Sequence, residues 1–255
     1  MRSPIKENIN NFCSSRMLKE IIPKGTVVNS FLFFSGDQEF SLAENGRFVV
    51  AHTNKYVIYE FWKCAMEEPQ RIAKIAEDMF SKMEGKWDSF RLFQENWPKY
   101  KNPYMRSALF FLLNRCSESG FISMGKLSDE RYNPISLSYL NNFNVDNFHI
   151  VWDKEENFHE TFSSIENTDY LLFPIGKFNY NLFEYGKNKG YEMTTIYHKK
   201  IHESLQEIKD KWVVLYKQHP HVFAMYKDYN IIMIDKYGRR TKEKENCEEL
   251  VIANF

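Results

Sequence analysis

The order of short apolar segments along this chain restricts its fold more than any other feature. After Phe148, β-branched and aromatic runs alternate with stretches whose apolar residues recur at helical spacing. Such alternation is typical of a parallel sheet covered by helices. The last two runs, at 231–234 and 250–253, are joined by a long basic connection and predict an antiparallel pair. We therefore predict an α/β protein with a Rossmann-like, mostly parallel sheet and an antiparallel C-terminal hairpin.

The same patterns predict the individual elements. Strands are expected at 26–34, 47–51, 148–152, 170–173, 212–216, 231–234 and 250–253. Helices are expected at 17–22, 57–65, 72–79, 105–113, 158–165, 196–208 and 222–226. Between 81 and 139 aromatic and basic residues interleave, which indicates an inserted helical subdomain. The predicted organisation is thus a core of residues 1–80 and 140–255, split by an insertion of residues 81–139.

Charge and cysteine usage narrow the function classes. The chain has 34 basic and 34 acidic residues, whereas proteins that depend on nonspecific nucleic-acid binding are usually basic overall. No apolar run approaches the roughly 18 residues that span a bilayer, so we expect no membrane partner. The cysteines at 13, 64, 116 and 247 form no Cys-x-x-Cys pair. With no signal peptide visible, we expect reduced thiols and a cytoplasmic location.

The C-terminal part carries the most specific ordered pattern. A helix containing His198 is followed by the strand 211–216, a short helix at 221–226, the strand 231–234, a basic loop and the final strand 249–255. In this order the chain resembles the Dam-type adenine-specific DNA methyltransferases, and the resemblance covers nearly the whole length. It implies a core that binds S-adenosylmethionine and an insertion that contacts DNA.

The resemblance also locates a weakened cofactor site. The family's Gly-Asn-Lys-like opening is matched by the segment 14–16, which keeps a basic residue but lacks the glycine. In the stretch 28–36, which matches the family's first strand and glycine-rich turn, Phe33 and Phe34 stand where small residues are expected and would fill the cofactor's space. Thr53 matches the end of the second strand, where the family has a ribose-binding carboxylate. The vestigial cofactor-binding candidates are Arg16, Asn29, Gly36 and Thr53, and we expect no bound cofactor.

The catalytic tetrapeptide departs furthest from the family. Where the family has Asp-Pro-Pro-Tyr, this chain has Phe173-Pro174-Ile175-Gly176. The family's Asp and prolyl carbonyl accept hydrogen bonds from the adenine amine, and its Tyr stacks on the flipped base. Phe173 accepts no hydrogen bond and Gly176 cannot stack, although Phe178 or Tyr180 is a neighbouring candidate for stacking. We name no catalytic residue, and an ordinary strand end in an unrelated α/β protein is the alternative interpretation.

The remaining functional candidates are basic residues of the insertion, because phosphate contacts position a protein on DNA. These candidates are Arg91, Lys99, Lys101, Arg106, Arg115, Lys126 and Arg131. His198 and His202 lie four residues apart without an evident third ligand, so no metal site is predicted. The run from Lys236 to Lys244 alternates with Glu243 and Glu245 and is typical of a solvated loop.

Two functions from different classes follow. The first is a catalytically inactive homologue of adenine-specific DNA methyltransferases, with DNA or a protein as its partner. The alternative is an active S-adenosylmethionine-dependent DNA adenine methyltransferase with a divergent catalytic site. A structural or virion-associated protein built on the same fold also fits the neutral, aromatic-rich composition, but no residue supports it specifically.

Overall fold

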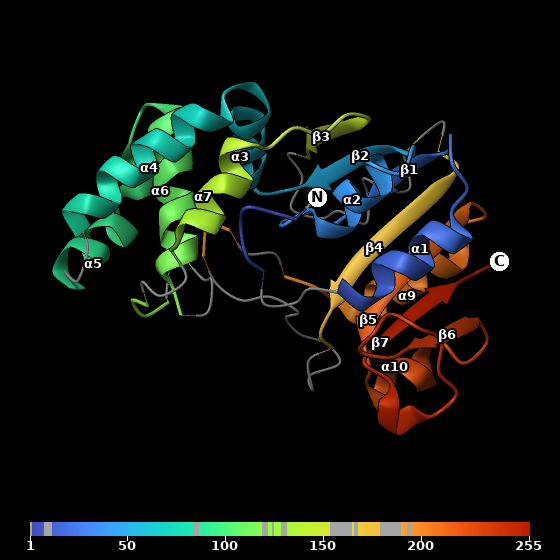
Figure 1. The fold of residues 1–255 in the computed structure, drawn as a ribbon. Helices are drawn as coiled ribbons and strands as arrows, with labels where there is room; N and C mark the ends of the chain where they lie inside the picture. Colours follow the sequence, from blue (N-terminus) through green and yellow to red (C-terminus); the bar gives the residue numbers. More distant parts are fainter. Residues whose placement is uncertain are drawn as a thin grey trace.

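The computed structural model describes residues 2–7, 12–83, 87–118, 122–123, 125–128, 132–153, 165, 168–178, 190–192 and 195–255. Within these residues the chain forms a twisted sheet with helices on both faces, and a group of helices beyond one edge of it (Figure 1). The predicted Rossmann-like α/β class is therefore confirmed. Across the described residues, every helix is either too short or too polar to cross a bilayer.

The described part of the sheet has seven strands in the order β3-β2-β1-β4-β5-β7-β6. The strands are β1 (Val27–Ser30), β2 (Phe48–Thr53), β3 (Phe148–Trp152), β4 (Tyr170–Gly176), β5 (Lys211–Lys217), β6 (Asn230–Ile234) and β7 (Glu249–Ala253). The first five are parallel, whereas β7 runs antiparallel to both β5 and β6. The predicted C-terminal hairpin is confirmed by the pairing of Ile231 with Ile252. Strand order reverses between β1 and β4, and Rossmann-like sheets bind ligands beyond the strand ends at this switch point.

The helices are α1 (Ser15–Ile21), α2 (Asp37–Ala43), α3 (Tyr56–Glu67), α4 (Pro69–Met83), α5 (Trp87–Asn96), α6 (Pro103–Cys116), α7 (Pro134–Asn141), α9 (His198–Glu207) and α10 (Pro220–Met225). Short 3₁₀ helices lie at Phe12–Ser14, Trp97–Lys99 and Lys244–Asn246. Local sequence determines where several of these helices begin. For example, the Asn102 side chain accepts the Met105 N–H and Pro103 occupies the first position of α6.

One predicted strand is shorter in the structure, and one helix of the structure was not predicted. The strand expected over 26–34 ends at Ser30, because Leu32 adopts a φ of 60° that an extended strand does not allow. The helix α2 was not predicted, since Gln38 and Glu39 are buried polar residues that interrupt its apolar period. The helix expected at 158–165 lies outside the described residues apart from its last position.

Alternating residues of the central strands face two separate hydrophobic clusters, as the pleat of a sheet requires. Phe173 and Trp212 pack in the cluster beneath α9 and α10, whereas Leu172 and Val213 pack in the cluster beneath α1 and α2. A third cluster joins the end of the sheet to α3, α4 and α6. Every residue of α6 from Ser107 to Cys116 is buried, so α6 is the central helix of this cluster. The division into a core and an insertion stays a prediction.

Candidate functional site

Aromatic rings fill the switch point between β1 and β4. The ring of Phe31, the residue that follows β1, stacks on Phe173 of β4 at 5.0 Å and on His52 of β2 at 4.8 Å. The interplanar angles are 15° and 18°, and all three side chains are buried. Aromatic pairs of this kind contribute about 0.5–1.5 kcal/mol beyond the burial of their area. The stack therefore holds the two halves of the sheet together at the position where related folds bind ligands.

Phe33 and Phe34, which we expected in the cofactor's space, lie in a different part of the molecule. Phe33 packs against Phe40 and Trp62. The carbonyl of Phe34 accepts a hydrogen bond of 2.7 Å from the Trp62 indole. Both residues belong to the cluster around α6, whereas Phe173 belongs to the cluster beneath α9 and α10. The aromatic residue beside Phe173 is therefore Phe31.

Three polar side chains form a hydrogen-bonded chain across the carboxyl ends of β1, β2 and β3. His52 Nε2 lies 2.9 Å from Asn29 Oδ1, and His52 Nδ1 lies 3.3 Å from the Asp153 carboxylate. The His52 and Asp153 side chains are only 8% and 9% exposed. A carboxylate at Nδ1 fixes the orientation of an imidazole, an arrangement also used in general-base catalysis. Here, however, Nε2 faces Asn29 and the ring face is covered by Phe31.

Asp153 is a carboxylate that sequence reasoning missed. We expected no acidic group beside Thr53 at the end of β2. The backbone N–H of Asp153 donates to the carbonyl of Thr53 at 2.9 Å, which places the residue after β3 directly beside that strand end. The sequence did contain a signal for Asp153, because it directly follows the predicted strand 148–152. The carboxyl ends of parallel strands lie at the same edge of a sheet, so this residue is expected near the end of β2.

Two acidic residues in the first turn of α2, Asp37 and Glu39, lie near the end of β1. Glu39 Oε1 accepts a hydrogen bond of 2.6 Å from the Ser30 hydroxyl. Burial raises the pKa of Glu39 to about 7, and the bond from Ser30 opposes part of this rise. Asp37, the first residue of α2, accepts the Ser3 N–H at 3.0 Å, and burial raises the pKa of Asp37 also. Both carboxyl groups are thus already engaged by protein donors.

The vestigial cofactor candidates do not form one group. Asn29 and Thr53 lie at the carboxyl edge of the sheet, where Thr53 Oγ1 accepts the Lys55 N–H. Gly36 has a φ of 80°, and a Cβ there would lie 2.4 Å from the Phe40 ring, so this glycine is needed to begin α2. Arg16 is 68% exposed on α1 and pairs with Glu20.

The tetrapeptide 173–176 forms the end of β4. Phe173 and Ile175 are fully buried, and the pairing with β5 shifts register between Pro174 and Gly176. Phe178, the neighbouring candidate for base stacking, is 7% exposed and packs at 4.5 Å from His198 and 4.8 Å from His219. Tyr180 lies outside the described residues. These aromatic rings serve as packing groups in this arrangement.

Of the three histidines that lie near Phe178, which are His198, His219 and His221, His198 is the most deeply buried. Its Nδ1 lies 3.0 Å from the Tyr216 hydroxyl, and burial lowers the pKa of His198 to about 4. His202 contacts the ring of Tyr226 at 4.9 Å from the next turn of α9. In the described part of the chain, no three His, Cys, Asp or Glu side chains are arranged to hold a metal ion.

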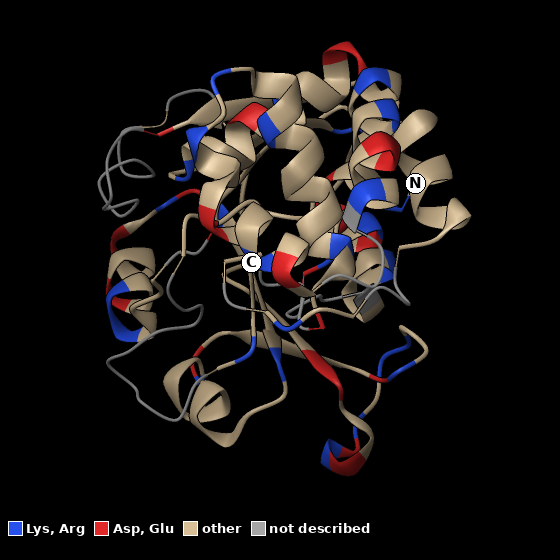
Figure 2. Cartoon of the chain, turned by 90° about the vertical axis from the view of Figure 1, so that its left-hand side faces the viewer, with Lys and Arg blue, Asp and Glu red and all other residues tan. Residues whose placement is uncertain are grey.

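The basic candidates of the insertion lie in contrasting environments. Arg106 binds both carboxylate oxygens of Glu60, which raises the pKa of Arg106, so its charge is already paired. Arg115 is 7% exposed, and burial lowers its pKa to about 10. Arg91 is exposed but pairs with Glu95 at 3.0 Å. Figure 2 shows Lys and Arg mixed with Asp and Glu over these helices. The exposed candidates without such a pair in the described residues are Lys99, Lys101 and Lys126, and Arg131 lies outside those residues.

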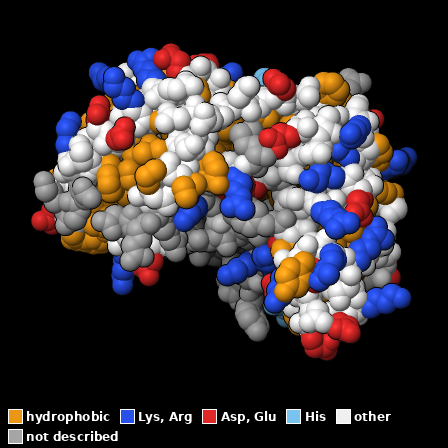
Figure 3. Space-filling view, viewed as in Figure 1, with side chains coloured by type: hydrophobic (Ala, Val, Ile, Leu, Met, Phe, Trp, Pro, Cys, Tyr) orange, Lys and Arg blue, Asp and Glu red, His pale blue; other side chains and the backbone are white. Residues whose placement is uncertain are grey.

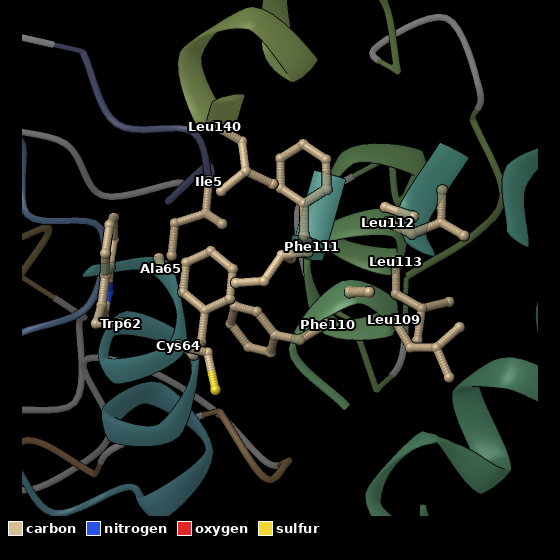
Figure 4. Packing of buried hydrophobic residues seen from close by; sticks show 14 of the residues in the cluster. Ile5, Trp62, Cys64, Ala65, Leu109, Phe110, Phe111, Leu112, Leu113 and Leu140 are labelled. Atoms are coloured by element: carbon tan, nitrogen blue, oxygen red, sulfur yellow. The ribbon is translucent and has the colours of Figure 1, made fainter. Parts of the chain in front are cut away.

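The buried Arg115 and its neighbour Asn114 fix the N-terminal segment against α6. Asn114 exchanges two hydrogen bonds with the backbone of Lys6, of 2.7 and 2.8 Å. Arg115 Nε donates to the carbonyl of Pro4 at 2.6 Å. Between these anchors, Ile5 is 2% exposed and points into the cluster formed by α3, α6 and α7 (Figure 4). The segment therefore occupies the space between α6 and the start of α2.

Comparisons with known proteins identify no family for this chain. A scan against protein-family models finds no match, and a search of curated proteins finds no significant similarity.

Proposed function

We propose that this protein is a catalytically inactive homologue of the adenine-specific DNA methyltransferases that acts as a binding module, with DNA or a protein as its partner. The observation that carries the proposal is the stack of Phe31 between Phe173 and His52 at the switch point. A fold of this class that keeps its sheet but packs its ligand position with aromatic rings retains a scaffold without a reaction centre.

The residues at the switch point do not fit S-adenosylmethionine. A ribose would need a carboxylate that is free to accept its hydroxyls. The nearby carboxylates already accept hydrogen bonds: Asp153 lies against His52, Glu39 is bound by Ser30 and Asp37 is bound by Ser3. The N-terminal segment also lies against the loop after β1, where Ser35 Oγ is 3.1 Å from the Glu7 carboxylate. Binding the cofactor would require several of these contacts to break together.

Titration calorimetry tests the proposal directly. With S-adenosylmethionine raised to millimolar concentration, we expect no saturable heat from the full chain. Thermal unfolding with and without the ligand provides a second measurement, because a ligand that binds only the folded state raises the melting temperature. Saturable binding in both measurements would contradict the proposal.

The alternative, an active methyltransferase with a divergent site, is favoured by the pair of His52 and Asp153 beside the switch point. It predicts saturable cofactor binding and transfer of a labelled methyl group to DNA. His52→Gln would then abolish transfer, whereas His221→Gln, a change at an exposed histidine, would not. Absence of transfer by the unmodified chain excludes this alternative.

A further inference from the structure

The connection between β6 and β7 is a fixed turn. Asp235 Oδ1 accepts the backbone N–H groups of Tyr237 and Arg239 at 2.8 and 2.9 Å. Gly238 has a φ of 75°, and a Cβ at this position would lie 2.9 Å from the carbonyl oxygen of Cys13. The sequence predicts a solvated loop here. Its side chains are exposed, but its backbone is held by its own hydrogen bonds and by close packing on the segment before α1.

The turn displays an exposed aromatic ring with two cations close to it. Tyr237 is 66% exposed. Lys236 Nζ and Arg239 Cζ lie 5.1 and 4.9 Å from the centre of its ring. Proteins that bind single-stranded nucleic acids use exposed aromatic rings accompanied by cations, because a base stacks on the ring while the cations attract phosphates.

Further positive charge surrounds this ring. Lys236, Arg240 and Lys242 are exposed, and none of them has a salt bridge within the described residues. Figure 3 shows Lys and Arg side chains over α1 and the adjoining β6–β7 connection, with acidic side chains among them and at the lower end of the connection. This surface differs from the described part of the insertion, where Arg91 and Arg106 are paired and Arg115 is buried.

A hollow of about 610 Å³ adjoins the ring. Its lining combines cations with the carboxylates of Asp235, Glu245 and Glu248 and the amide of Asn246. Carboxylate and amide oxygens accept hydrogen bonds from the amino groups of bases. The hollow therefore suits the edge of an unpaired base better than a second anionic group.

We propose that the β6–β7 turn binds single-stranded nucleic acid, with one base stacked on Tyr237 and neighbouring phosphates on Lys236, Arg240 and Lys242. This inference rests on the DNA-binding role proposed above and moves that role from the insertion to the C-terminal hairpin. It is independent of whether the switch point binds a cofactor.

The test is a fluorescence-anisotropy titration of the full chain with a labelled single-stranded oligodeoxynucleotide of mixed sequence. We expect Tyr237→Ala to weaken binding about tenfold, since the stacked base is lost. Tyr197→Ala is the matched control, because Tyr197 is also exposed and lies 5.5 Å from the Lys200 ammonium, yet should leave binding unchanged. A Tyr237→Ala variant that binds like the original chain would overturn the inference.

A second experiment removes positive charges and measures how the salt dependence of binding changes. Lys236→Gln with Lys242→Gln should reduce the salt dependence of binding by about 1.4 in the log–log slope, since each single-strand phosphate contact contributes about 0.7. The control removes the same charge from the insertion through Lys99→Gln with Lys101→Gln, and no change is expected. If only the control weakens binding, the site lies on the insertion and the turn is excluded while the DNA-binding role stands.

Two competitors complete the design. A duplex of the same sequence should compete less well than the single strand, because its bases are already stacked, and polyglutamate should compete poorly. Equal competition by either would overturn the inference in favour of a general anion surface. Absence of any oligonucleotide binding at low salt would contradict both this inference and the proposed DNA-binding role. The proposal that the protein is catalytically inactive is tested separately, by calorimetry with S-adenosylmethionine.

Discussion

Glu39 is the residue whose ionisation affects folding most clearly. Burial raises its pKa from the ordinary 4.5 to about 7, so the folded chain holds this proton more tightly than the unfolded chain does. The resulting stability is fully present below pH 4.5 and is lost as pH rises through 7. From the shift, the loss is on the order of 3 kcal/mol.

We predict that Glu39→Gln removes this pH dependence. A glutamine keeps the acceptor for the Ser30 hydroxyl but cannot ionise, so the variant should equal the original chain near pH 4 and exceed its free energy of unfolding at pH 8. Urea unfolding at both pH values measures the difference. Glu44→Gln, a change of the residue that follows α2, is the control. Parallel pH profiles of the original chain and the Glu39 variant would contradict the prediction.

Single residues also mark the limit of sequence reasoning about the site. The lack of a hydrogen-bond acceptor at Phe173 is readable from the sequence, because a phenyl side chain cannot accept a hydrogen bond in the way that a carboxylate does. The partner of Phe173 was not readable, since the positive φ of Leu32 decides whether Phe31 or Phe33 turns toward β4. Likewise, Arg106 and Arg115 differ from exposed lysines only through tertiary contacts with Glu60 and Pro4.

At the scale of elements, the N-terminal segment depends on one apolar anchor. Ile5 is 2% exposed within the cluster around α6, so Ile5→Ala should lower the free energy of unfolding by about 2–4 kcal/mol. Ile135→Ala is the matched control, because Ile135 is 62% exposed and should cost less than about 0.5 kcal/mol. Denaturant unfolding of both variants compares them, and equal effects would mean that the segment does not contribute to stability.

The strands were more predictable than the connections between them. Apolar runs such as 170–173 and 212–216 are continuous because they are covered on both faces of the sheet. In contrast, α2 carries Glu39 and Gln38 at buried positions, so its apolar residues do not recur at a clear helical spacing. Burial of polar groups is decided by partners such as Ser30 and Ser15, which are distant in the sequence.

At the scale of the whole molecule, one hydrophobic cluster joins the helices of the predicted insertion to the sheet. Phe110 of α6 packs at 5.1 Å from Phe61 of α3 and at 6.3 Å from Phe34 after β1. We therefore predict a single cooperative unfolding transition in which the calorimetric and van't Hoff enthalpies agree. Leu109→Ala should shift the entire transition to lower temperature. Two separate transitions would show instead that the insertion is an independent folding unit.

The position of β7 between β5 and β6 has a consequence for synthesis. Because β7 follows both neighbours in the chain, β6 has no partner in the described sheet and one side of β5 stays open until β7 has been made. At this stage the backbone N–H and C=O groups of the isoleucine-rich strand β6 are unpaired, and they are available for pairing with other chains. A chaperone that shields β6 during translation would protect the yield of folded protein, and chains truncated before residue 249 should collect in inclusion bodies.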